Sequence, residues 1–122
     1  MLGAVDATQA IADLTEISPQ VRHVAVIGAD GGVSGSNLPD TARSDRLATA
    51  ARRLVETAEE LRPGVAQLEA ATPVGSVFVV RDGDRLIAAT TTPEPTVGLV
   101  FYDLKTCLRS IGEAKKVDNA AA

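Results

Sequence analysis

The longest periodic segment of the chain, residues 39–62, contains the run SDRLATAARRLVETAEEL. At about 100° per residue, its apolar side chains fall within an arc roughly 160° wide, with charged side chains opposite. A helix that packs on a single core needs an apolar stripe only about 100° wide. We therefore predict one long helix over Pro39–Arg62, with part of its stripe left over for a second surface.

The two edges of this stripe carry side chains of different size. The leucine edge repeats every seven residues and consists of Leu47, Leu54 and Leu61. The small edge consists of Ala48, Ala51 and Val55. Because small side chains let two helices approach closely, we predict that the leucine edge covers the sheet and that the small edge is free to meet another helix.

Composition narrows the class of protein. The chain has 122 residues, of which 45% are hydrophobic and 23% charged, as in an average soluble domain. A net charge of -4 and 2% aromatic residues argue against nucleic-acid binding, which needs a basic footprint or stacking side chains. We expect a single domain over residues 1–116 and a disordered tail at 117–122.

Two further features concern the cellular setting. The chain has one cysteine and one histidine, which excludes a disulfide framework and a Cys/His zinc cluster. The first residues lack the pattern of a signal peptide, and no apolar run approaches the roughly 18 residues that span a bilayer. We therefore expect a cytoplasmic protein without direct membrane insertion.

The remaining segments alternate between helical and extended patterns. Asp6 or Thr8 can cap a first helix, which Ser18-Pro19 ends. Short apolar runs separated by Asp-Gly or Pro-Gly signals predict strands. They are 24–27, 33–38, 65–72, 75–81 and 84–92. The order is helix, strand, strand, long helix, three strands and a last helix, which is an α+β fold.

The last helix competes with an extended interpretation. Val97, Leu99 and Phe101 alternate as in a strand. Seven apolar residues of the same segment, however, share roughly 120° of a helical wheel, and we therefore predict a helix capped by Thr96. Leu99 and Tyr102 fall outside the apolar stripe and are candidates for contact with a partner.

No catalytic motif is present. A Walker A loop needs a lysine after its glycines, and the first lysine of the chain is Lys105. His23 is the one conventional base near neutral pH, and we expect a cross-strand polar pair there, with Ser34 or Ser36 as conceivable hydroxyl partners. Cys107 lies in an apolar arc, where a cysteine behaves as a small hydrophobe. We predict no catalytic residue, no metal and no cofactor, so the chain is not expected to be an enzyme.

Three stretches together resemble the roadblock family, which includes dynein light chains and bacterial regulators of Ras-like GTPases. They are VAVIGADGG, the alanine-rich helix SDRLATAARRLVETAEEL, and GSVFVVRDGDRLIAATTTPEPTVGLVFYDL. The resemblance implies a five-stranded antiparallel sheet with the long helix on one face and the other two helices on the opposite face. It supplies no catalytic residues.

The resemblance also implies an oligomeric state and a function. Family members form homodimers or heterodimers with a related roadblock subunit, in which the long helices pack antiparallel and the strand after each helix pairs across the two-fold axis. The implied dimer interface consists of Ala48, Ala51, Arg52, Val55, Glu59, Gln67 and Glu69. The implied function is a non-catalytic signalling regulator or scaffold that binds a small Ras-like GTPase. The alternative is a small-molecule sensor of profilin-like architecture.

Overall fold

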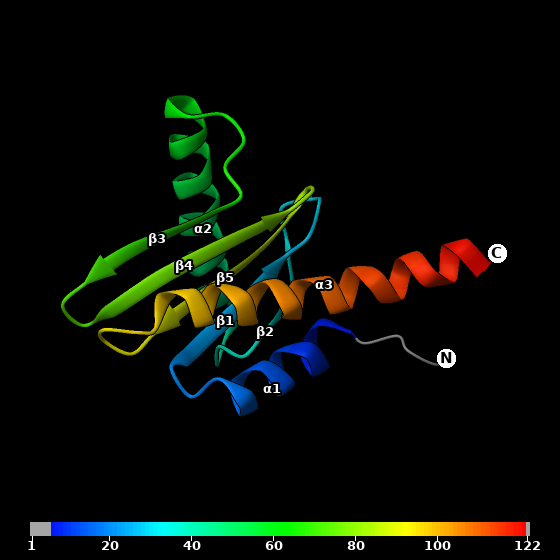
Figure 1. Ribbon diagram of the computed structural model, residues 1–122, viewed down its shortest axis with the longest axis horizontal. Helices are drawn as coiled ribbons and strands as arrows, with labels where there is room; N and C mark the ends of the chain where they lie inside the picture. The colour runs from blue at the N-terminus through cyan, green and yellow to red at the C-terminus, as the bar shows by residue number, and fades with distance from the viewer. Residues whose placement is uncertain (1–5, 122) are drawn as a thin grey trace.

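The computed structural model describes the backbone of residues 6–121 and the side chains of residues 6–111. Its elements follow the predicted order, and their bounds lie close to the predicted ones (Figure 1). They are α1 (Ala7–Ile17), β1 (Val21–Ile27), β2 (Val33–Ser36), α2 (Thr41–Leu61), β3 (Gln67–Thr72), β4 (Gly75–Asp82), β5 (Arg85–Thr91) and α3 (Val97–Ala121). In the part of the chain that the structure describes, no helix is both long and apolar enough to cross a membrane.

Local caps explain where the helices begin. The Asp6 side chain accepts a hydrogen bond from the backbone N–H of Gln9 at 2.8 Å, so Asp6 and not Thr8 caps α1. Asp40 caps α2 in the same way, through the N–H of Arg43 at 2.8 Å. Each cap satisfies one of the free N–H groups at a helix start.

The C-terminal segment is helical, as the seven-residue apolar arc predicts. Thr96 directly precedes α3, and its carbonyl accepts a hydrogen bond from the N–H of Val100 at 3.0 Å. The disordered tail expected at 117–122 overlaps the end of α3, where side chains lie outside the described residues. That expectation therefore stays a prediction, as does the domain boundary at 116.

The five strands form one antiparallel sheet in the order β2-β1-β5-β4-β3. β1 lies inside the sheet because it pairs with β2 on one side and with β5 on the other. The short strand β2 lies at one edge of the sheet, and β3 lies at the other. The fold class predicted from the sequence is confirmed.

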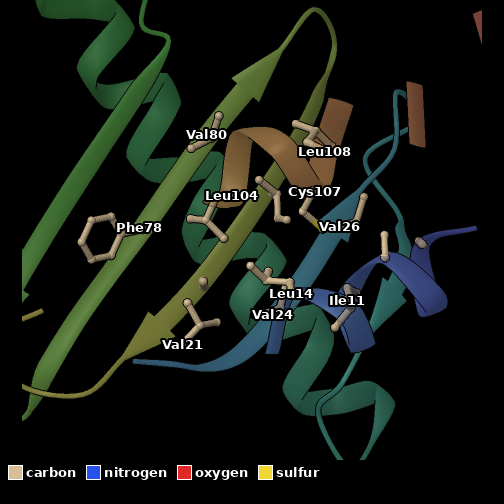
Figure 2. Packing of buried hydrophobic residues seen from close by; sticks show 14 of the residues in the cluster. Ile11, Leu14, Val21, Val24, Val26, Phe78, Val80, Leu104, Cys107 and Leu108 are labelled. Carbon is tan, nitrogen blue, oxygen red and sulfur yellow. The ribbon is translucent and has the colours of Figure 1, made fainter. Parts of the chain in front are cut away.

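The sheet separates two apolar cores. The first core lies between the sheet and the pair α1 and α3 (Figure 2). Phe78 of β4 is fully buried there, and its ring meets Phe101 of α3 edge to face with centroids 4.9 Å apart. The second core lies between the sheet and α2. The expected placement of one helix on one face and two on the other is therefore confirmed (Figure 1).

Gly75 fixes the hairpin between the edge strand β3 and β4. Its φ of 143° lies in a region that side chains with a Cβ rarely adopt. A Cβ at this position would lie 2.2 Å from the carbonyl oxygen of Thr91. The close pairing of β4 with β5 at this end of the sheet therefore requires glycine.

Candidate interaction surface

The two edges of α2 are placed opposite to the prediction. Ala48, Ala51 and Val55 retain 1%, 0% and 7% of their exposure within the single chain, in the second core with Val79 and Ala88. The small edge therefore faces the sheet and cannot form a dimer seam. The physical reason is that small side chains let α2 lie close to the sheet, which presents Val79 and Ala88 beneath it.

The leucine edge lies on the flank of α2. Leu47 and Leu54 are only partly buried against the second core, and Leu61, the last residue of the helix, is 73% exposed. In Figure 1 the C-terminal part of α2 stands beyond the strands. The apolar stripe of α2 is thus wider than the part that packs on the sheet, as predicted. The part that is not fully buried is the leucine edge.

Arg52 is used within the chain. Its guanidinium donates a hydrogen bond to the carbonyl oxygen of Gly31, in the turn between β1 and β2. A second, longer contact joins it to the hydroxyl of Thr49 at 3.4 Å. Arg52 therefore ties α2 to a sheet turn, and this role was missed by the assignment of Arg52 to a dimer interface.

Glu59 also acts within the chain, at the connection from α2 to β3. Its carboxylate accepts hydrogen bonds from the N–H groups of Gly64 at 2.7 Å and Val65 at 3.0 Å, and pairs with Arg81 of β4 at 3.5 Å. The two backbone hydrogen bonds, more than the charge of Arg81, hold the pKa of Glu59 below its ordinary value of 4.5. Glu59 therefore fixes the loop that connects α2 to the edge strand β3.

The edge strand β3 pairs only with β4 among the described residues, from Gln67 opposite Val80 to Thr72 opposite Gly75. Its outer backbone edge is consequently open to another strand. Gln67 and Glu69 are exposed on this strand, and Glu69 accepts a hydrogen bond from the hydroxyl of Ser76 at 2.9 Å. Their predicted place at a dimer edge stays a prediction.

An apolar surface borders this open edge on the α2 side of the sheet. Because side chains alternate along a strand, Leu68 of β3 and its partner Val79 share that side. We call the apolar surface the ledge and define it by its partly buried members Leu54, Leu68 and Val77, which pack against the second core. The cause is that α2 packs chiefly over β1, β2 and β5, which leaves β3 and part of β4 only partly covered.

Leu99 and Tyr102 lie on α3, which covers the opposite face of the sheet (Figure 1). They are 49% and 66% exposed. The prediction that they point away from the core is confirmed, whereas contact with a partner stays a prediction.

The two side chains with catalytic potential, His23 and Cys107, make contacts typical of structural residues. His23 Nδ1 lies 3.4 Å from the hydroxyl of Thr90 on β5, so the cross-strand polar contact exists, but with Thr90 and not with Ser34 or Ser36. Cys107 is buried, and its burial, with a smaller contribution from the charge of Asp13, raises the pKa of the thiol to about 11. Within the described residues, no group of three metal-ligating side chains is found.

The antiparallel five-stranded sheet, with one long helix on one face and two on the other, has the fold of solved Roadblock/LC7 structures. A Roadblock/LC7 domain from Streptomyces avermitilis superposes with a TM-score of 0.76 at 17% identity, covering 89% of this chain and 97% of that one. Myxococcus xanthus MglB gives a TM-score of 0.71 at 13% identity, covering 91% and 95%.

A further MglB structure, described as having a tetrameric arrangement, gives a TM-score of 0.67 at 14% identity and covers 88% of this chain and 86% of that one. No family model and no curated protein matches the sequence. The chain therefore has the roadblock fold that its sequence resembles, and at these identities the likeness shows the fold alone.

Proposed function

We propose that this chain is a non-catalytic, dimeric regulator or scaffold that binds a small Ras-like GTPase in the cytoplasm. The observation that carries the proposal is the open edge of β3 beside the ledge. Proteins with a long unpaired strand edge next to exposed leucines normally cover it, because it invites pairing with another chain. The partner that best fits is a second copy or a related roadblock subunit.

The geometry of such a dimer follows from a two-fold axis next to β3. An isologous contact places each surface against its own mate, so antiparallel pairing of two β3 strands brings the two ledges together. The α2 helices then pack through Leu54 and Leu61, and not through Ala51 as the sequence suggested. Glu59 supports the contact indirectly, because it holds the loop before β3.

Leu61→Glu tests the dimer. The side chain is 73% exposed in one chain, so the variant should fold normally while placing a charge in the proposed interface. Ile17→Glu is the matched control, because Ile17 also ends a helix and is 66% exposed, but on the other face of the sheet. Light scattering should report a dimer for the wild type and Ile17→Glu, and the 12.6 kDa monomer for Leu61→Glu.

A wild-type monomer at every concentration would overturn the dimer. A Leu61→Glu variant that stays dimeric would move the interface elsewhere on the molecule. Circular dichroism on both variants verifies that the fold is intact.

The GTPase is tested separately. Each candidate Ras-like GTPase from the same source is mixed with the protein in its GDP and GTP states, and both complex formation and GTP hydrolysis are measured. Faster hydrolysis identifies an activator, and binding alone identifies a scaffold. Absence of binding in both states would remove the main support for the proposal.

Leu99 and Tyr102 are the residues that we assign to partner contact on α3. Tyr102→Ala should weaken the GTPase complex by roughly tenfold if its ring is an anchor of the interface. Ile17→Ala removes an exposed apolar side chain from α1 and is the control. Equal binding by both variants would place the contact away from Tyr102.

The small-molecule sensor alternative stays a prediction. Mass spectrometry of the protein under native conditions, directly after purification, would reveal a retained ligand. A stoichiometric adduct would favour the sensor over the scaffold.

A further inference from the structure

A small cleft lies between α3 and the end of β4, away from the ledge. It is lined by Val80, Arg81, Asp82, Lys105, Leu108 and Arg109, and its volume is about 80 Å³. Val80 of β4 and Leu108 of α3, both nearly fully buried, supply its apolar floor (Figure 2). One water needs roughly 10–15 Å³ on the same measure, so the cleft has room for a group larger than one water.

The cleft is basic although the chain as a whole is acidic. Lys105 and Arg109 of α3 and the carboxylate of Asp82 are its charged groups, whereas the net charge of the chain is -4. Lys105 and Arg109 stand four residues apart on α3, which places them on the same helix face, and both are exposed. The helix α3 therefore brings two cations to one hollow.

The walls of the cleft are fixed by contacts outside it. Arg85 donates one hydrogen bond to the carbonyl oxygen of Leu108 at 3.2 Å and pairs with Asp82 at the same distance. This contact joins the β4–β5 hairpin to the middle of α3 and compensates the charge of Asp82. The guanidinium of Arg81 pairs with Glu59 at 3.5 Å on the α2 side of the sheet, so its charge does not face the cleft. The carboxylate of Asp82 is thus already paired with Arg85, and it does not neutralise Lys105 and Arg109 across the cleft.

We propose that this cleft binds the phosphate group of a small phosphomonoester. A phosphomonoester carries about -1.5 to -2 charges at neutral pH and three acceptor oxygens. Arginine can donate two parallel hydrogen bonds to such a group, and lysine contributes a compact charge. The net positive lining of the cleft matches a dianion, and the apolar floor suits the organic part of the ligand.

The test is a titration of the isotope-labelled protein, followed by NMR, with inorganic phosphate and with phenyl phosphate at constant ionic strength. We expect saturable shifts confined to the amides around residues 80–85 and 105–109. Tighter binding of phenyl phosphate would show that the natural source is an organic phosphomonoester, and equal binding would indicate free phosphate. Shifts that grow without saturation, or that spread over the arginines of α2, would overturn the proposal.

Lys105→Gln and Arg109→Gln each remove one exposed cation of the cleft. Each should weaken binding by roughly tenfold, because a charge-assisted hydrogen bond is lost. Arg53→Gln, at an exposed position of α2, removes the same charge elsewhere and should bind as the wild type does. Equal affinities for all four proteins would also overturn the proposal. The experiment uses the protein alone, so its result does not depend on the GTPase proposal.

Discussion

The two faces of the sheet are covered to different extents. On one face α1 and α3 lie side by side and bury a continuous core from Ala7 to Leu108 (Figure 1). On the other face α2 alone covers β1, β2 and β5, and the ledge is left beside the open edge of β3. A helix is about 10 Å across, and five strands at about 4.8 Å spacing with lengths near 20 Å offer more area than one helix covers. The first face is covered within the single chain, and the half-open face is where we propose that a partner binds.

Ala51→Glu should have the largest effect on the half-open side, because Ala51 is fully buried between α2 and the sheet. An unpaired charge in the seam between helix and sheet costs about 3–5 kcal/mol or more, a large share of the stability of a small domain. We expect loss of the cooperative unfolding transition, measured by circular dichroism. Leu61→Glu, ten residues further along α2, should unfold like the wild-type monomer. A folded, monomeric Ala51→Glu variant would mean that the small edge does face a partner.

Phe78→Ala tests the closed face. Phe78 is fully buried and packs edge to face on Phe101, so truncation should reduce the free energy of unfolding by about 3–5 kcal/mol. Leu68→Ala on the ledge should cost about 1 kcal/mol in the monomer, because the side chain is only partly buried there. Urea denaturation at low protein concentration measures both. Similar losses of unfolding free energy for the two variants would show that the two faces of the sheet are buried to the same extent.

Gly75→Ala tests the hairpin that carries the open edge. The strained φ and the approach of a Cβ to Thr91 predict a loss of about 2 kcal/mol or more. Gly83→Ala, in the β4–β5 turn, is the matched control, because it too has a positive φ but no atom within 4 Å of the added Cβ. The thermal midpoint of Gly75→Ala should therefore fall further. An equal fall for both variants would show that backbone strain, not the contact with Thr91, determines the cost.

The sequence predicted the order of elements and the layers well, but not the orientation of α2. Periodicity defines an apolar arc, and the arc of α2 is correct. Which flank meets the sheet depends on the shape of the sheet surface, and Ala88 and Val79 lie too far from α2 in sequence to reveal that shape. The small residues of α2 pack against the sheet, and Leu61 is left exposed to solvent. The prediction had placed the leucine edge on the sheet and the small edge away from it.

The intramolecular roles of Arg52 and Glu59 were unpredictable for another reason. On a helical wheel both belong to a charged face, and most such faces are simply solvated. The contacts that distinguish them go to backbone groups, Gly31 for one and Gly64 with Val65 for the other. Backbone partners carry no signature in the sequence beyond glycine in a turn.

Glu59→Gln should have the smallest effect and a defined dependence on pH. Folding lowers the pKa of Glu59 below 4.5, so the ionised carboxylate stabilises the folded chain above that value, and the contribution is lost as the pH falls through the lower pKa of the folded state. The wild type should therefore be more stable than Glu59→Gln at pH 7, and the difference should disappear in acid. Glu56→Gln, on the exposed side of α2, should show no such convergence. Urea midpoints from neutral pH into acid measure this.

The same variant links the two regions, because the loop that Glu59 holds leads directly into β3. If the fixed loop prepares the open edge for pairing, Glu59→Gln should weaken the dimer more than it weakens the fold. The variant gives the loop conformational freedom, and dimer formation must then remove that freedom at a cost in entropy. Sedimentation at neutral pH over a range of concentrations compares the dimer dissociation constants of Glu59→Gln and Glu56→Gln. Equal constants would confine the role of Glu59 to the stability of the single chain and would leave the ledge alone to account for association.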